Sequence, residues 1–287
     1  MQWKTNKLID LRKQYLEELS AFYDLTEAGS MLSILIQHFF SLSLSSLLSK
    51  PDFRLSESEM LQLHFAVKEL KKYRPVQYIV GDTEFFGLPI KVNESVLIPR
   101  PETEELLELI LSNEKEKGQK ILDIGTGSGC IAIALSKNMS EAQLTGIDIS
   151  NDALELAAEN CAINQTTIKF EQIDILDQNQ WNLLEQFDLI VSNPPYVTHF
   201  EKNKMQENVL NYEPHLALFV PDNNALVFYE AILDFSMKHL NINGRFYFEI
   251  NESKGDEIVK LAISKSFSKV KLHQDIHGKN RFISGSK

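Results

Sequence analysis

The chain of 287 residues contains only two cysteines, Cys130 and Cys161. Both lie in apolar stretches with helical spacing, so we expect buried, reduced thiols and a reducing compartment. Cysteine and histidine show none of the paired spacings that hold a metal ion, so we expect no metal site.

The sequence also lacks a long uninterrupted apolar run. Its most apolar window, Met31–Leu48, carries five serines as well as Gln37 and His38. We therefore expect a core helix there and no membrane span. The start of the chain, Met1–Lys7, leads into a charged amphipathic helix without the apolar core of a signal peptide. We expect a cytoplasmic protein without a membrane partner.

Positive charge is scarce, because 29 Lys and Arg face 40 Asp and Glu, for a net charge of −11. A long duplex footprint requires a basic face, so we expect no direct nucleic-acid partner. The hydrophobic content of 43% and the charged content of 24% are typical of a soluble globular protein. The length allows one large domain or two unequal ones, and we expect a monomer.

Residues 1–75 show helical periodicity only. One apolar stripe is formed by Leu8, Leu11, Tyr15, Leu16 and Leu19, and Ser56 with Glu59 has the spacing of a capping box. This region contains no catalytic constellation. We expect a small helical bundle that serves packing or partner recognition.

Residues 76–96 change to short strand-like pieces, Val76–Val80 and Phe85–Val92, around a turn at Gly81-Asp82. This pattern predicts a β-hairpin linker. Arg100 follows between two prolines, in an extended segment before a helix capped near Thr103. Two interpretations of Arg100 stay open: a surface residue at a helix start, or a residue that closes a cofactor pocket.

Residues 97–287 alternate strand and helix patterns. The predicted strands are 121–124, 143–149, 168–173, 187–191, 245–250 and two around Val270 and Phe282. Strands separated by helices form βαβ units, so an α/β fold is expected, with a mostly parallel sheet and helices on both faces. The last two strands are separated only by Gln274–Lys279 and must form an antiparallel hairpin at one end.

A glycine-rich loop, Asp123-Ile-Gly-Thr-Gly-Ser-Gly129, follows the first of these strands. Its spacing, Gly-x-Gly-x-Gly, differs from the dinucleotide fingerprint, which requires a third glycine where Cys130 stands. Gly125, Thr126, Gly127, Ser128 and Gly129 are therefore predicted to bind a nucleoside with an amino-acid tail rather than a pyrophosphate.

Acidic residues end the next two predicted strands. Asp148 is placed to accept hydrogen bonds from both ribose hydroxyls of that nucleoside. Asp174 is placed to accept from the adenine amine, and Ile175 is expected to form a wall beside the ring.

The strand Phe187–Val191 leads to Ser192-Asn193-Pro194-Pro195-Tyr196. Two prolines remove two backbone donors, so the carbonyls of this turn need an external partner. The turn thus offers a carbonyl, the Asn193 amide oxygen and an aromatic face to a planar NH2 group. A rigid turn without function is the alternative, and the glycine loop upstream counts against it.

The chain resembles the HemK/PrmC family of protein-glutamine methyltransferases that act on peptide chain release factors. The likeness extends over nearly the whole length and rests on Pro75–Ile79, Ile98–Glu104, Asp123–Cys130, Ser192–Tyr196, Tyr212–Pro214 and Asp275–Arg281. It implies a Rossmann-like class I methyltransferase domain with a seven-stranded, mostly parallel sheet. It also implies an N-terminal helical bundle that recognises the substrate.

The resemblance further implies that S-adenosyl-L-methionine is the cofactor. Gly125–Gly129, Asp148 and Ile175 would line its site, together with Arg100, Asp174 and Asn193. The residues Asn193, Pro194, Pro195 and Tyr196 would hold the glutamine of a class I release factor. The alternative is an adenine-amine methyltransferase that uses the same loop on nucleic acid.

Overall fold

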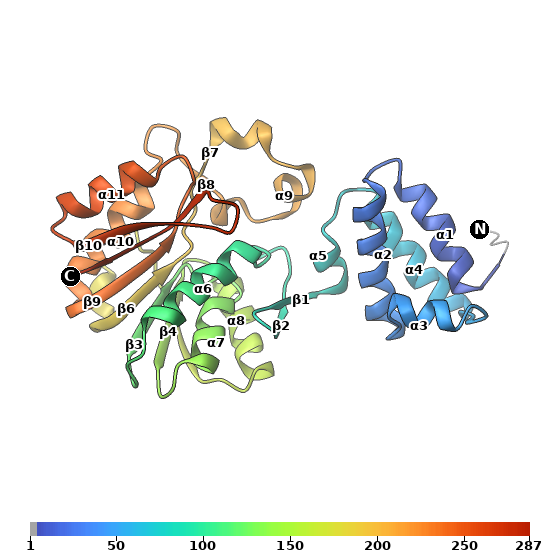
Figure 1. Cartoon of the computed structure of the whole chain (residues 1–287), viewed down its shortest axis with the longest axis horizontal. Helices are drawn as coiled ribbons and strands as arrows, with labels where there is room; N and C mark the ends of the chain where they lie inside the picture. Colours follow the sequence, from blue (N-terminus) through green and yellow to red (C-terminus); the bar gives the residue numbers. More distant parts are fainter. Residues whose placement is uncertain (1–4) are drawn as a thin grey trace. The chain divides into compact units, whose positions relative to one another are not determined.

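The computed structural model describes residues 5–287, except for the side chain of Lys204. Residues 1–4, part of the segment for which no signal peptide is expected, lie outside the described residues. The chain forms two compact units (Figure 1). One comprises the chain up to Gly81 together with Gln206–Tyr212, and the other comprises Asp82–Met205 and Glu213–Lys287.

The first unit is a bundle of α-helices around one apolar core. Its helices are α1 (Leu8–Leu19), α2 (Leu25–Phe40), α3 (Leu44–Ser49), α4 (Glu57–Leu70), α5 (Val76–Val80) and α9 (Glu207–Tyr212). The predicted capping box at the start of α4 is confirmed, since Ser56 and Glu59 exchange side-chain and backbone hydrogen bonds. The Tyr212 hydroxyl donates to the Lys72 carbonyl (2.9 Å) and so ties α9 to the segment after α4.

Two predictions for this unit are wrong. The window Met31–Leu48 is not one helix, because Ser41 adopts a left-handed conformation (φ 53°) and α3 begins only at Leu44. Val76–Val80 is helix α5 rather than a strand, with Pro75 before it and Gly81 ending it at φ 85°. A five-residue apolar run has no periodicity that distinguishes a strand from a buried helix.

The β-hairpin is formed by β1 (Asp82–Phe85) and β2 (Leu88–Lys91). Its turn lies at Phe86-Gly87, where both residues have positive φ, and not at Gly81-Asp82 as predicted. Two central residues with positive φ are typical of the tight turns that suit strand twist. The hairpin belongs to the second unit.

A buried asparagine attaches the hairpin to helix α8 (Asn151–Ile163). Asn160 accepts a hydrogen bond from Lys91 N (2.7 Å) and donates to Lys91 O (3.0 Å) and to Ser128 O (2.9 Å). One side chain therefore fixes both the hairpin and the glycine loop.

The second unit contains a seven-stranded sheet with the order β10-β11-β9-β6-β3-β4-β5. Its strands are β3 (Lys120–Ile124), β4 (Gln143–Asp148), β5 (Ile168–Gln172), β6 (Phe187–Ser192), β9 (Leu240–Glu249), β10 (Ser268–Gln274) and β11 (Asn280–Ser286). Pairing is parallel from β9 to β5, and β11 is antiparallel to both of its neighbours. The predicted α/β fold with an antiparallel hairpin at one end is confirmed.

Helices cover both faces of this sheet (Figure 1). Helices α6 (Pro101–Asn113), α7 (Cys130–Asn138) and α8 pack on one face, and α10 (Val227–His239) and α11 (Gly255–Ser264) pack on the other.

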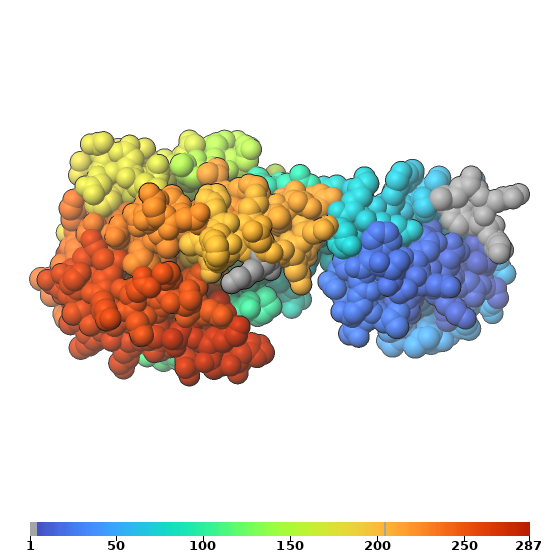
Figure 2. Space-filling view, turned by 90° about the horizontal axis from the view of Figure 1, so that it is seen from above, coloured from blue at the N-terminus to red at the C-terminus, as the bar shows by residue number. Residues whose placement is uncertain are grey.

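Shorter elements are η1 (Trp181–Leu183), β7 (Val197–Thr198), η2 (His199–Lys204), η3 (His215–Ala217) and β8 (Phe219–Val220). The C-terminal segment, orange and red in Figure 2, forms much of the visible surface of this unit. Within residues 5–287, no helix is long and apolar enough to cross a membrane.

The strand order reverses between β3 and β6, since the chain continues to β4 on one side of β3 and places β6 on the other. Ile124 and Ser192 are register partners at the ends of these strands, and Ser192 Oγ donates to Ile124 O (2.7 Å). Ligands of open α/β sheets bind in the crevice at such a reversal. The glycine loop and the Asn-Pro-Pro-Tyr turn leave the sheet side by side at this point.

Asp123, next to this reversal on β3, is completely buried. Thr126 Oγ1 donates to Asp123 Oδ2 (2.6 Å), whereas Oδ1 has no hydrogen-bond partner among the described residues. Burial raises the pKa of Asp123 to about 7, although the bond from Thr126 opposes the shift. This side chain therefore binds its proton more tightly in the folded state than in the unfolded chain.

We expect Asn160→Ala to lower the free energy of unfolding by about 2–4 kcal/mol, because buried backbone groups of the hairpin and the glycine loop lose their partners. Urea denaturation measures this change. Asn138→Ala is the control, since this exposed side chain bonds only within its own helix, and a change below about 0.5 kcal/mol is expected. Equal effects of the two variants would contradict the role of Asn160.

Asp123 makes the stability depend on pH. Because its folded pKa is raised, the folded state holds more protons between about pH 4 and pH 7, and its contribution to stability falls as pH rises through that window. We expect the difference in unfolding free energy, wild type minus Asp123→Asn, to fall by a few kcal/mol between those pH values and to level off above pH 7. A constant difference in urea denaturation across this range would refute the assignment.

Candidate active site

A cavity of about 360 Å³ lies at the carboxyl ends of the parallel strands. Its lining comes from the glycine loop, the ends of β4 and β5, the turn after β6, the segments 95–100 and 214–217, and residues of helices α6, α7, α8 and α10. Of the predicted site residues, the lining includes Arg100, Gly125, Thr126, Gly127, Ser128, Asp148, Asp174, Ile175, Asn193, Pro194 and Pro195. A cavity of this size accommodates a small organic ligand.

Glycine is required in the loop for two different reasons. Gly125 and Gly127 have φ of 71° and 53° with open space where a Cβ would lie, so only their backbone conformation demands glycine. At Gly129, a Cβ would come within 3.1 Å of Ala157 Cβ. The predicted ligand contact of Gly129 is not reflected in the cavity lining. Gly129 also has a positive φ of 78°; it is the N-cap of α7 and lets that helix pack closely on α8.

Asp148 holds the two loops beside it. Its Oδ2 accepts from Gly127 N (3.0 Å) and its Oδ1 from Ser150 N (2.9 Å). Burial raises the pKa of Asp148, and the backbone donors act against that shift. The carboxylate thus lines the cavity at a fixed position, with acceptor capacity left for a ligand hydroxyl.

The far wall of the cavity is formed after β5. Asp174 accepts from Leu176 N (2.9 Å), and the Ile175 carbonyl accepts from the indole of Trp181 (3.0 Å). The two predicted residues are therefore held by the turn that follows them, with an apolar and an acidic group next to each other.

Arg100 is half-buried and forms an ion pair with a buried carboxylate. Its Nη2 lies 2.6 Å from Glu213 Oε1, and Glu213 is only 3% exposed. Glu213 Oε2 also accepts from Ile98 N (3.3 Å). The pair joins two segments that line the cavity, which connects the motif around Arg100 with the motif Tyr212–Pro214.

The amide of Asn193 has a defined orientation. Its Nδ2 donates to Thr103 Oγ1 (3.2 Å), and Thr103 Oγ1 donates to Glu249 Oε2 (2.7 Å). Helix α6 begins at Pro101 after Arg100, so the prediction of a cap near Thr103 is wrong. Thr103 lies in the first turn of α6, and its buried hydroxyl accepts the hydrogen bond from Asn193.

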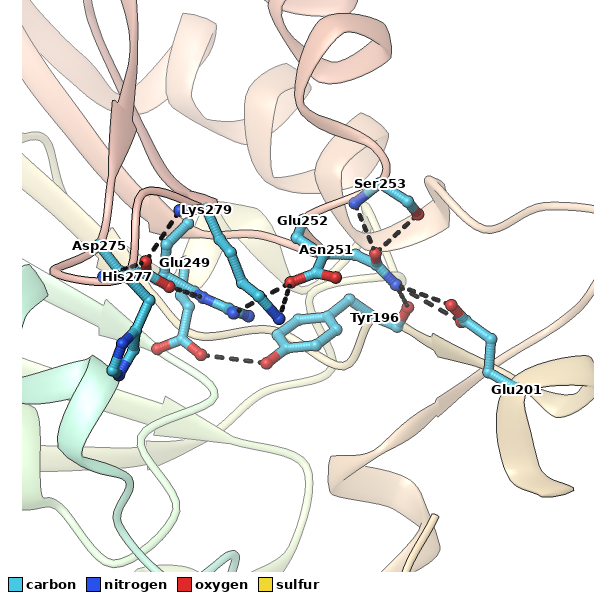
Figure 3. A network of polar contacts seen from close by, with 10 residues as sticks. Tyr196, Glu201, Glu249, Asn251, Glu252, Ser253, Asp275, His277 and Lys279 are labelled. Carbon is cyan, nitrogen blue, oxygen red and sulfur yellow. Dashed lines mark hydrogen bonds and ion pairs between the residues drawn. The ribbon is translucent and has the colours of Figure 1, made fainter. Parts of the chain in front are cut away.

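Tyr196 points its hydroxyl to Glu249 Oε1 (3.1 Å; Figure 3). Burial raises the pKa of Tyr196, and the neighbouring Glu249 adds to the shift. The cavity lining from this turn consists of Asn193, Pro194 and Pro195. Packing of the Tyr196 ring on a substrate amide stays a prediction.

Sequence reasoning missed three polar residues of this site: Thr103, Glu213 and Glu249. Thr103 and Glu213 lie in the motifs Ile98–Glu104 and Tyr212–Pro214, which carry the family resemblance, but neither was predicted as a site residue. Glu249 ends an apolar strand, and a charged residue at the carboxyl end of a buried strand was the available signal. It is 2% exposed, and burial raises its pKa while hydrogen bonds from Thr103 and Tyr196 and the charge of Arg281 act against the rise.

Comparison with known proteins agrees with this geometry. Residues 102–215 match the family model of the methyltransferase small domain, and residues 10–81 match that of the PrmC N-terminal domain. The chain is similar to a methyltransferase of known structure from Pyrococcus furiosus, with a TM-score of 0.52 and 18% identity over 81% of this chain and 99% of that one. That likeness concerns the fold alone.

Two relatives are similar over most of the sequence. A release factor glutamine methyltransferase of Flavobacterium psychrophilum is 45% identical over 276 residues, which cover 95% of this chain and 96% of the relative. One of Lactococcus lactis is 46% identical over 232 residues, or 80% of this chain and 84% of the relative. With these matches and the motifs at the cavity, the chain belongs to the HemK/PrmC family of release factor glutamine methyltransferases.

Proposed function

We propose that this enzyme transfers a methyl group from S-adenosyl-L-methionine to the side-chain amide nitrogen of glutamine in the Gly-Gly-Gln motif of class I peptide chain release factors, and thereby modulates translation termination in the cytoplasm. One observation carries the proposal. The glycine loop with Asp148 and the turn with Asn193 and Pro194 line the same cavity. The close relatives bear the name of this activity.

The residues around the cavity fit the cofactor. Asp148 would accept from the ribose hydroxyls, Asp174 from the adenine amine, and Ile175 would cover the ring, while Gly125 and Gly127 allow close approach of the backbone. Arg100 would complete the site, and Asn193 would make only a minor contact with the cofactor. When bound, S-adenosyl-L-methionine supplies an electrophilic methyl group on a positively charged sulfur.

The chain's task is to orient a weak nucleophile. An amide nitrogen shares its lone pair with the carbonyl, as in the peptide bond. Asn193 Oδ1 and the Pro194 carbonyl would accept the two amide hydrogens, which aligns the nitrogen and favours positive charge on it. Positioning of this kind contributes about 7–11 kcal/mol in well-oriented reactions. The methylated nitrogen is acidic enough to lose its proton to water, so no strong general base is required.

The helical unit is proposed to recognise the body of the release factor. A single glutamine offers little discrimination, so further contacts must select the protein. This unit matches the PrmC N-terminal domain and exposes large apolar side chains, among them Leu25, Leu48 and Phe65. We propose that the enzyme acts as a monomer and without nucleic acid.

Transfer of labelled methyl to four substrates tests the function: a class I release factor, the same factor with the Gly-Gly-Gln glutamine replaced, a short Gly-Gly-Gln peptide, and adenine-containing DNA or RNA. We expect label on the intact factor, with a lower KM than for the peptide, and none on the replaced factor. Label on nucleic acid alone would replace the proposal by an adenine-amine methyltransferase.

We expect Asn193→Ala to lower kcat about 100-fold or more and to change the Kd of the cofactor less than about threefold. The variant removes an acceptor that acts on the reacting amide, and losses of such groups typically cost this much. Single-turnover transfer and calorimetry of cofactor binding measure the two quantities. If Asn193→Ala weakened cofactor binding as much as it lowered kcat, this division of roles would be refuted.

We expect the opposite pattern for Asp148→Ala. Loss of a charged acceptor should raise the Kd of the cofactor about 10- to 100-fold, with a smaller effect on kcat at saturation. Glu257→Ala is the control, because this exposed carboxylate on helix α11 bonds Lys254 and does not line the cavity. An unchanged Kd in Asp148→Ala would remove this residue from the cofactor site.

A further inference from the structure

We propose that Glu249 is a positioning residue that sets the orientation of the Asn193 amide through the Thr103 hydroxyl. The inference rests on the proposed function, because it concerns the acceptor that Asn193 offers to the substrate. Three elements meet here: the end of β9 supplies Glu249, the first turn of α6 supplies Thr103, and the turn after β6 supplies Asn193.

The register of the sheet brings these groups together. Ser192 is the partner of Phe248 in the β6·β9 pairing, so Asn193 and Glu249 are the next residues on adjacent parallel strands. Hydrogen bonds fix both the backbone and the side chain of Glu249. Tyr229 donates to its backbone carbonyl oxygen (3.1 Å), and the hydroxyls of Thr103 and Tyr196 donate to its two carboxylate oxygens. The carboxylate therefore has little freedom to move.

The direction of the hydrogen bonds follows from elementary chemistry. Ionised Glu249, the form that Arg281 favours, has acceptors only, so the single proton of the Thr103 hydroxyl is used on Glu249. The Thr103 oxygen can then only accept from Asn193, which must present Nδ2 to it. Asn193 Oδ1 is left as the acceptor for the substrate. An acceptor at this position selects a substrate that brings an N–H group.

The terminal motif Asp275–Arg281 acts on Glu249 through the charge of Arg281. Asp275 accepts from His277 N and Lys279 N (2.9 Å each) and from Arg281 Nε (3.2 Å), which closes a tight turn. Arg281 also reaches Glu252 (3.5 Å), and its charge favours the ionised form of Glu249. Figure 3 shows the hydrogen bond between Tyr196 and Glu249 and, in the same view, the bonds that Asp275 accepts. The motif lines no part of the cavity, and its effect on Glu249 is electrostatic.

The test compares variants of the full-length enzyme with the intact release factor as substrate. Thr103→Val removes the hydroxyl with little change in shape, and we expect kcat to fall about tenfold, with KM and the Kd of the cofactor changed less than about threefold. Thr103→Ser keeps the hydroxyl and should restore most of the lost kcat. In Glu249→Gln, the amide can either accept from Thr103 or donate to it, so the direction of this hydrogen bond is no longer fixed. We expect a smaller loss of kcat than in Thr103→Val.

The double variant Thr103→Val/Glu249→Gln distinguishes positioning from general structural damage. If Glu249 acts through Thr103, the double variant has the kcat of Thr103→Val within about twofold. Matched controls are Glu114→Gln, another buried hydrogen-bonded carboxylate, and Thr145→Val, another buried threonine. Both should keep the wild-type kcat. Thermal unfolding confirms that each variant is folded.

Three results would overturn the proposal: an unchanged kcat in Thr103→Val, effects of Thr103→Val and Glu249→Gln that multiply, or an equal loss in the controls. If Thr103→Val does not fold, the test uses Glu249→Gln and Thr103→Ser instead. We expect Glu249→Gln to lose kcat and Thr103→Ser to keep it. Wild-type enzyme that labels nucleic acid and not the factor would refute the proposed function separately. The same variants are then assayed on that substrate, whose amine also needs an acceptor.

Discussion

The parallel pairing of β3 with β6 is the constraint on which the site depends. Ile124 and Ser192 are register partners at the ends of these strands, and the Ser192 hydroxyl donates a hydrogen bond to the Ile124 carbonyl. Because side chains and loops leave parallel strands at the same edge, this pairing brings the glycine loop next to the Asn-Pro-Pro-Tyr turn. A shift of one residue would turn the strand side chains to the other face and separate the loops.

Buried acidic groups surround this edge of the sheet. Asp123, Glu213 and Glu249 are each at most 3% exposed. A buried carboxylate is costly unless it is bonded, and each meets this requirement differently. Glu213 pairs with Arg100, Glu249 accepts from two hydroxyls near Arg281, and Asp123 Oδ2 accepts from Thr126. These bonds fix the positions of the acidic groups at this edge of the sheet.

Local signals were read correctly where the chemistry is local. The glycine loop and Asn193 follow predicted strands, and Asp148 ends one. The capping box of Ser56 and Glu59 needs only four residues. The error at Val76–Val80 has a physical cause, because a short apolar run between Pro75 and Gly81 suits either a strand or a helix turn. The Thr103–Glu249 contact joins residues 146 positions apart, beyond any local pattern.

The sequence by itself determined the fold class, the family and the residue types at the ends of β3, β4 and β6, since these follow from periodicity and from short motifs. Only the tertiary structure decided what those residues bond. It paired Arg100 with Glu213, turned Tyr196 toward Glu249 and oriented the Asn193 amide through Thr103. The reason is that a hydrogen bond has a direction and a length of about 3 Å, and strand register, which no short segment encodes, sets which groups meet at that length.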